Sequence, residues 1–207
     1  MIGIIDYGMG NLRSVFNAFE FIGAAVEIIS DPRDLKRATG IVLPGVGAFG
    51  DGIRNLHTRG FVGAMEEEVR SKGKPLLGIC LGMQLLAKTG YEYGENPGLG
   101  WIDGVVDRLP VPEAEPRLRI PHIGWNDVRF AKRDGLFAGL GETSCFYFVH
   151  SYALRPTDGG IVSGECGYGA NFVAAIETGN IYATQFHPEK SHRAGLTVLR
   201  NFIRLVK

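Results

Sequence analysis

Cys80 is the residue in this sequence best placed to act as a nucleophile. It lies between Gly78 and Gly82, after the apolar run 75–77 and before a helix-forming run that continues through Lys88. A strand that turns sharply into a helix holds one side chain at the apex, and glycines let the backbone pass where a Cβ would clash. The positive end of the following helix would favour the reactive thiolate. This order predicts a nucleophile elbow; the alternative is a buried, unreactive cysteine at a strand end.

A cysteine nucleophile needs a base, and the base needs a group that orients it. Of the five histidines, His187 follows the strand-like run 181–186 and precedes Pro188 and Glu189. Glu189 is near enough to accept a hydrogen bond from one imidazole nitrogen, which leaves the other to face a thiol, and proline stiffens the turn. A lone histidine at a strand end is more often a satisfied surface residue. Together with Cys80, however, these residues predict a Cys-His-Glu triad.

The first half of the chain must supply the strands that position this chemistry. Short apolar runs alternate there with segments of helical periodicity, which predicts a parallel α/β sheet with helices on both faces. Ligands of such sheets bind beyond the carboxyl ends of the strands. Cys80 and the turn at 44–47 both follow strands, so we expect them to line one site. The strands are expected at 2–5, 25–29, 41–43 and 75–77, and the helices at 11–22, 51–56 and 61–71, with a short one opened by Asp31 and Pro32.

The second half indicates antiparallel additions to this sheet, followed by a closing helix at 193–206. The stretch 91–121 is rich in glycine and proline, and no repeat or linker divides the chain. We therefore predict one domain over residues 1–207, a mostly parallel open sheet flanked by helices, of flavodoxin-like type, with antiparallel strands in the C-terminal half. Those later strands are expected at 104–109, 128–130, 145–149, 161–163, 172–176 and 181–186.

Composition excludes several classes of protein. The 22 basic and 22 acidic residues are interspersed and the formal net charge is zero, which argues against a nucleic-acid or anionic-membrane partner. No apolar run approaches the roughly 18–20 residues that span a bilayer, and Asp6 interrupts the start too early for a signal peptide. Cys80, Cys145 and Cys166 form neither a disulfide framework nor a metal-ligand spacing. A cytoplasmic chain with reduced thiols and no metal or cofactor is expected.

The motifs at 78–84 (GICLGMQ) and 187–189 (HPE) resemble those of class I, triad-type glutamine amidotransferases. The resemblance covers nearly the whole chain. Within that class, five further stretches are similar to the glutaminase subunits of imidazole glycerol phosphate synthases, which act in histidine biosynthesis. These stretches are DYGMGNL at 6–12, PGVGAF at 44–49, PHIGWN at 121–126, YFVHSY at 147–152 and HPEKS at 187–191.

The resemblance implies that Cys80 attacks the side-chain amide of glutamine, that His187 shuttles the proton and that Glu189 holds the imidazole. Elbow geometry makes the Leu81 N–H one oxyanion donor, and the family implies the Val46 N–H as the second, with flanking glycines that let that peptide rotate. Gln84 lies one helical turn after Cys80, so both can face one pocket. The residues implied in glutamine binding are Gly47, Gln84, His150, Ser151 and Tyr152.

Glutaminases of this kind release ammonia to a partner. The resemblance implies a heterodimer with a cyclase subunit, a β/α barrel that uses the ammonia and a phosphoribosyl-formimino carboxamide ribonucleotide. The products are imidazole glycerol phosphate and an aminoimidazole carboxamide ribonucleotide. Asn11, Trp125 and Lys190 are expected near the partner face, although Trp125 could equally be a core residue and Lys190 a solvated charge.

Other interpretations are weaker. Glutaminases of the anthranilate, aminodeoxychorismate or vitamin B6 pathways share the triad, but the motifs at 44–49 and 121–126 argue against them. A cysteine peptidase or stress protein with an elbow cysteine does not account for His187 and Glu189, and a binding module with a vestigial cysteine does not account for an intact triad. A nucleotide site at Gly8 and Gly10 lacks the third glycine of its fingerprint.

Overall fold

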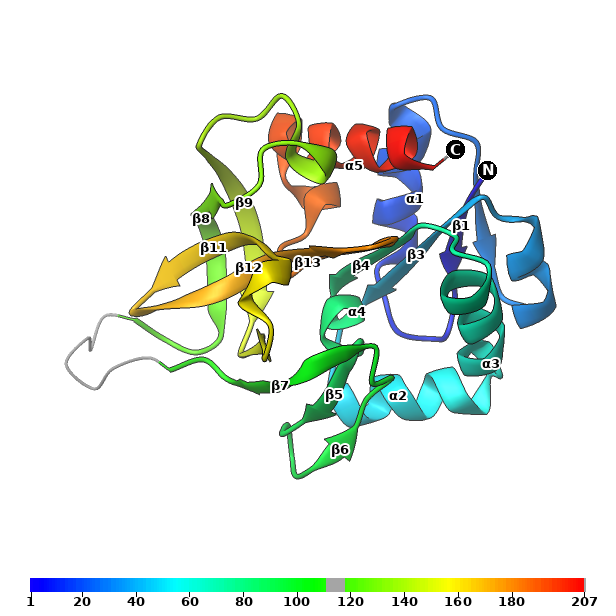
Figure 1. Cartoon of the computed structure of the whole chain (residues 1–207), viewed down its shortest axis with the longest axis horizontal. Coiled ribbons are helices and arrows are strands. Elements are labelled where there is room, and N and C mark those ends of the chain that lie inside the picture. Colours follow the sequence, from blue (N-terminus) through cyan, green and yellow to red (C-terminus); the bar gives the residue numbers. More distant parts are fainter. Residues whose placement is uncertain (111–117, 207) are drawn as a thin grey trace.

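The computed structural model describes residues 1–110 and 118–206, and its secondary structure forms two sheets with helices around the larger one (Figure 1). The nine-stranded sheet has the order β2-β1-β3-β4-β13-β12-β11-β8-β9. Its first five strands are parallel, which confirms the predicted α/β core. These strands are β1 (Ile2–Ile5), β2 (Val26–Ile29), β3 (Gly40–Gly45), β4 (Leu76–Cys80) and β13 (Ile181–Thr184).

The remaining four strands of this sheet pair antiparallel, as the second half of the sequence predicts. They are longer than the apolar runs that indicated them, because their exposed faces carry polar residues that a search for apolar runs passes over. Their bounds are β8 (His122–Phe130), β9 (Thr143–His150), β11 (Val162–Tyr168) and β12 (Ala170–Thr178). Part of the stretch predicted to hold only short strands, 111–117, lies outside the described residues.

A second, four-stranded sheet has the order β10-β7-β5-β6; it was not predicted as a separate sheet, although the strand predicted at 104–109 is present in it as β7. The helix expected to run from the elbow through Lys88 is wrong, because α4 covers only Leu81–Gln84. The carbonyls of Leu85 and Leu86 accept hydrogen bonds from the backbone at 99–102, so tertiary pairing overrides helix propensity there. The strands are β5 (Ala87–Gly90), β6 (Asn96–Pro97), β7 (Ile102–Arg108) and β10 (Tyr152–Pro156).

Helices cover both faces of the parallel strands (Figure 1). On one face, α1 (Leu12–Phe21) and α5 (His192–Leu205) pack with Ile2 and Ile4 in one apolar cluster. On the other face, α2 (Phe49–Thr58) and α3 (Phe61–Met65) pack with Ile5 in a second cluster. The strands are therefore apolar on both sides, which explains their continuous apolar runs.

The short helical segments predicted from local sequence are present. Asp31 caps a 3₁₀ turn at Pro32–Arg37 by accepting a hydrogen bond from the Arg33 N–H. After α3, the predicted helix continues as a π-helical segment at Glu66–Ser71. Short 3₁₀ turns also occupy Gly135–Phe137, Gly159–Ile161 and Pro188–Lys190.

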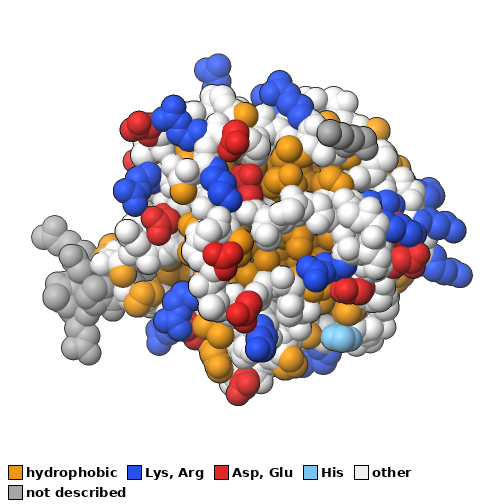
Figure 2. Space-filling view, in the orientation of Figure 1, with side chains coloured by type: hydrophobic (Ala, Val, Ile, Leu, Met, Phe, Trp, Pro, Cys, Tyr) orange, Lys and Arg blue, Asp and Glu red, His pale blue; other side chains and the backbone are white. Residues whose placement is uncertain are grey.

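The surface agrees with the balanced composition. On the face seen in Figure 2, acidic and basic side chains are interspersed around apolar areas near the centre. Within the described part of the chain, no helix combines the length and the apolar character that crossing a membrane requires.

Candidate active site

Cys80 is the last residue of β4 and lies at the apex of a strained turn. Its backbone has φ +55° and ψ −109°, a conformation that side-chain-bearing residues rarely adopt. A Cβ on Gly82 would collide with the backbone carbonyl of Leu43 on β3, so only glycine lets the turn approach that strand. The predicted elbow is therefore confirmed in its backbone. The helix behind it has a single turn, so the helix field at Cys80 is smaller than a long helix would give.

His187 and Glu189 lie just beyond β13, the parallel neighbour of β4. The imidazole Nδ1 is 2.8 Å from the Glu189 Oε1, and both side chains are almost fully buried. Nε2 makes no hydrogen bond of normal geometry to a described residue, which leaves it available to the Cys80 thiol. Burial alone would lower the pKa of His187, but Cys80 on one side and Glu189 on the other raise it to about 10.

The turn that carries His187 is anchored to β9. The His187 N–H donates to the Tyr147 carbonyl at 3.0 Å. The Ser191 hydroxyl donates to the His187 carbonyl at 2.6 Å and accepts the Tyr147 N–H at 3.0 Å. These bonds fix the turn at both ends, so the imidazole is held without help from a substrate.

The turn after β3 lies beside the elbow, as expected for two neighbouring strand ends. Gly45 pairs directly with Cys80 in the parallel register. Val46 follows with 41% of its surface exposed, and Gly47 has φ +105°. An exposed side chain followed by a glycine gives this peptide few contacts that hold its orientation.

A cavity of about 560 Å³ opens over Cys80. All seven residues predicted to bind glutamine or its oxyanion line this cavity, and Lys190 is the one predicted interface residue that does. The lining consists of Val46, Gly47, Ala48, Cys80, Leu81, Gln84, Glu92, Tyr93, Pro121, Val149, His150, Ser151, Tyr152 and Lys190.

The other two predicted interface residues lie outside the cavity. Trp125 is 46% exposed and stacks on His192, with ring centroids 4.7 Å apart. Asn11 is exposed and caps α1 by accepting the Ser14 N–H. Trp125 is thus not a core residue, which settles the alternative that the sequence left open.

His150 lines the cavity as a neutral ring. Its Nδ1 is 2.9 Å from the Tyr152 carbonyl, which can only accept, so this nitrogen carries the proton. Nε2 then accepts from the His122 Nδ1 at 3.0 Å. Burial lowers the pKa of His150 to about 3 and that of His122 to about 4. Both ring nitrogens of His150 are engaged by protein groups, so it shapes the cavity rather than offering a free hydrogen bond.

Glu92 is a charged residue of the cavity that the sequence did not single out. Its Oε2 accepts the Phe49 N–H at 2.8 Å, at the start of α2. Glu92 and its neighbour Tyr93 belong to a loop without a motif. Only the pairing of β5 with β7, which was not predicted, carries this loop to the cavity.

Labelling by a glutamine analogue with an electrophilic carbon in place of the amide tests whether Cys80 reacts in preference to the other two thiols. We expect one adduct, at Cys80, by mass spectrometry of peptides. Burial raises the pKa of Cys145 and, to about 12, that of Cys166, and the Asp127 carboxylate adds to both shifts. Iodoacetamide, which lacks the amino-acid end, is the matched reagent control. Equal labelling of all three thiols by the analogue would contradict an activated Cys80.

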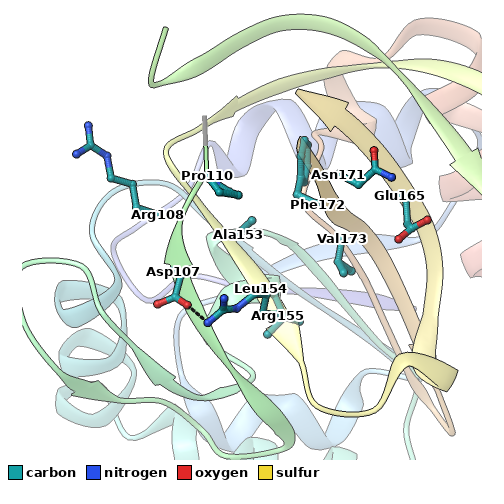
Figure 3. Close-up of a pocket in the computed structure, with 10 residues that line it drawn as sticks. All are labelled: Asp107, Arg108, Pro110, Ala153, Leu154, Arg155, Glu165, Asn171, Phe172 and Val173. Atoms are coloured by element: carbon teal, nitrogen blue, oxygen red, sulfur yellow. Dashed lines mark hydrogen bonds and ion pairs between the residues drawn. The ribbon is translucent and has the colours of Figure 1, made fainter. Parts of the chain in front are cut away.

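A second, smaller cavity of about 140 Å³ lies between β7 and β10 on one side and β11 and β12 on the other. In Figure 3 the Asp107 carboxylate and the Arg155 guanidinium point toward each other across β7 and β10, whereas Arg108 points away. None of the triad or cavity residues described above lines it. In residues 1–110 and 118–206, no set of three His, Cys, Asp or Glu side chains is arranged to hold a metal ion.

Comparison with known proteins identifies a family whose members resemble this chain over nearly its whole length. The family described as glutamine amidotransferase class-I matches residues 3–205. The imidazole glycerol phosphate synthase subunit HisH of Moorella thermoacetica is 48% identical and covers 100% of this chain and 95% of its own. The subunit of the same name from Aquifex aeolicus is 48% identical over 97% of this chain and 95% of its own.

Solved structures are similar in fold at lower identity. One described as a glutamine amidotransferase has a TM-score of 0.76 at 21% identity and covers 99% of this chain and 98% of its own. The PurLQS structure from Thermotoga maritima has a TM-score of 0.76 at 18% identity and covers 100% and 98%. At these identities the likeness supports the fold alone.

Proposed function

The chain belongs to the class I glutamine amidotransferases, among the imidazole glycerol phosphate synthase subunits HisH, and from this premise we propose that residues 1–207 form one domain that hydrolyses glutamine to glutamate and ammonia. The observation that carries the proposal is the buried His187–Glu189 pair, with its available Nε2, behind a cysteine that opens on a cavity of about 560 Å³. That volume accommodates a small amino acid.

In the first half of the reaction, the Cys80 thiolate attacks the side-chain amide carbon of glutamine. A C–S bond forms and the carbonyl electrons move to oxygen, where the N–H groups of Leu81 and Val46 stabilise the charge. The raised pKa of His187 means that its ring is protonated at neutral pH. It donates this proton to the amide nitrogen, the C–N bond breaks and ammonia leaves a thioester on Cys80.

In the second half, water attacks the thioester. His187 takes one proton from water as the oxygen bonds to the thioester carbon, the C–S bond then breaks, glutamate is released and the Cys80 thiolate is regenerated. Glu189 keeps Nδ1 protonated throughout, so Nε2 is the nitrogen that exchanges protons. Gly47, Gln84, Ser151 and Tyr152 bind the amino-acid end of glutamine, and His150 shapes the wall beside them.

The acceptor of the ammonia is a cyclase subunit. The names of the relatives are those of a synthase subunit, and this chain covers 95% or more of the Moorella and Aquifex subunits. It therefore corresponds to the glutaminase subunit. Lys190 lines the cavity, and both its ammonium and the Trp125 ring lie against Tyr147; with Asn11 these two residues form part of the docking face in a heterodimer. Free Cys80, Cys145 and Cys166 fit the reducing cytoplasm, where histidine biosynthesis would run.

Glutamate release measured with and without a cyclase subunit and its ribonucleotide substrate tests this function. We expect slow hydrolysis by the chain alone and a strong rise with both additions. The reason is the loosely held turn at Val46, whose peptide must present its N–H to the oxyanion. Cyclase without ribonucleotide is the matched control. Full activity of the isolated chain would contradict control by this turn, and absence of hydrolysis in the complete mixture would contradict the function.

A further inference from the structure

Gln185 is a buried residue that the mechanism above does not use. It follows β13 and precedes His187 by two positions, and its exposed surface is 0%. Its backbone N–H donates to the Ala174 carbonyl on β12 at 2.8 Å, which fixes the main chain. A fully buried amide costs free energy unless its polar atoms find partners, so the partners of this side chain need an explanation.

The orientation of the Gln185 amide follows from its neighbours. The Gln84 Nε2 is 2.9 Å from the Tyr152 carbonyl, which can only accept, so that atom of Gln84 must be the donor. The same nitrogen lies 3.0 Å from Gln185, so the Gln185 atom that faces it must be Oε1. The other end of the Gln185 amide, Nε2, then faces the Cys80 Sγ at 3.6 Å. A flipped Gln185 would place nitrogen against nitrogen and oxygen against sulfur.

We propose that Gln185 is a catalytic residue whose side-chain N–H stabilises the Cys80 thiolate, and that Gln84 fixes the orientation of this donor. The proposal rests on the proposed function for the reaction that the thiolate performs. Cys80 is buried, and α4 has only one turn, so the helix field that it supplies at the sulfur is small. A second N–H donor besides His187 compensates, because hydrogen bonds to a charged acceptor are the stronger ones.

The same donor serves both halves of the reaction. The sulfur is negative before attack and becomes negative again when the C–S bond breaks on hydrolysis, and the Gln185 N–H faces it on each occasion. Both N–H groups of Gln84 are used, by Tyr152 and Gln185, so its own Oε1 is the atom left for the substrate in the cavity. The α-ammonium group of a substrate bound at this oxygen is then connected to the sulfur through the side-chain amides of Gln84 and Gln185.

Alkylation of Cys80 by iodoacetamide as a function of pH tests the donor without requiring turnover. The variants are Gln185→Met, which removes the donor at similar length, and Gln185→Glu, which keeps an oxygen for Gln84 and puts an acceptor against sulfur. We expect the pH of half-maximal labelling to rise by about one unit in Gln185→Met, a tenfold loss of thiolate at neutral pH, and by more in Gln185→Glu. Asn201→Leu removes another buried amide, which donates to the Leu136 and Ala138 carbonyls and not to the sulfur, and should leave the pH of half-maximal labelling unchanged.

Labelling of the buried Cys166 in the same samples reports loss of fold. A shift at Cys80 alone supports the donor. A shift at neither cysteine, or equal shifts at both, would overturn it. In the complex with cyclase, kcat should fall about tenfold for Gln185→Glu with KM for glutamine nearly unchanged, because Gln185 does not line the cavity. A chain that shows the labelling shift but never hydrolyses glutamine would refute the proposed function and leave this donor standing.

Discussion

Cys80→Ala will lower kcat for glutamine hydrolysis by at least about four orders of magnitude, since removing the nucleophile of a comparable triad costs on the order of 10⁶. The substrate carbon then has no nucleophile to form a covalent bond with, and His187 has no thiolate to pair with. Cys80→Ser should be nearly as inactive, because a serine hydroxyl loses its proton far less readily than a thiol. The measurement is glutamate release in the complete mixture with cyclase and ribonucleotide.

These variants should fold and bind the partner as the parent chain does. Alanine and cysteine meet the same restriction at φ +55°, so the backbone strain is unchanged. The hydrogen bonds that the Cys80 Sγ makes to the Val149 carbonyl and the Gln185 amide are long, 3.9 and 3.6 Å, so its removal should cost the fold little. Cys145→Ser, at an exposed thiol, is the matched control and should keep full activity. Hydrolysis above about one hundredth of the parent rate in Cys80→Ala would sink the assignment of the nucleophile.

Gly82→Ala is expected to destabilise the fold by several kcal/mol, at the upper end of what one methyl group does. The added Cβ would collide with the Leu43 carbonyl, which is backbone of a central strand and cannot swing aside as a side chain could. Either β3 or the elbow must move, and the cavity is lined by the elbow and by the turn that follows β3. Urea unfolding followed by circular dichroism measures the loss.

Gly63→Ala provides the opposite case. Gly63 lies in α3 with nothing within 4 Å of an added Cβ, so the same methyl group should stabilise the protein by about 0.5–1 kcal/mol through helix propensity. A Gly82→Ala protein as stable as the Gly63→Ala protein would show that the elbow does not depend on close backbone packing.

The sequence predicted the parallel core and the triad because each depends on local signals. Continuous apolar runs mark strands covered on both faces, and β1 and β4 obey this pattern. Cys80 and His187 follow neighbouring parallel strands, so placing the strands places both residues at one edge. The roles of individual cavity residues remain predictions, although the cavity gathers most of them.

Of the second sheet, only the strand predicted at 104–109 was found from the sequence, as β7, and its other strands and their pairing were missed because nothing local specifies them. The segment from Leu85 to Lys88 has helical propensity. It instead forms a turn and the start of β5, which depend on hydrogen bonds to residues 99–102 that no local pattern predicts. Glu92 reaches the cavity only through that pairing. Gln185 was missed for another reason. A buried glutamine has no periodicity of its own, and its function lies in which way its amide points, which partners far away in sequence determine.

The backbone at Cys80, with φ +55°, lowers the stability of the fold at the same position where activity requires a cysteine side chain. Holding a side chain there costs on the order of 1–3 kcal/mol, and glycine, which removes most of that cost, brings back only about 0.5–1 kcal/mol of unfolded-state entropy. A lineage that no longer needed the ammonia would gain stability by drifting to glycine at this position. The backbone at the apex therefore favours glycine, and a cysteine there supplies chemistry at a cost in stability.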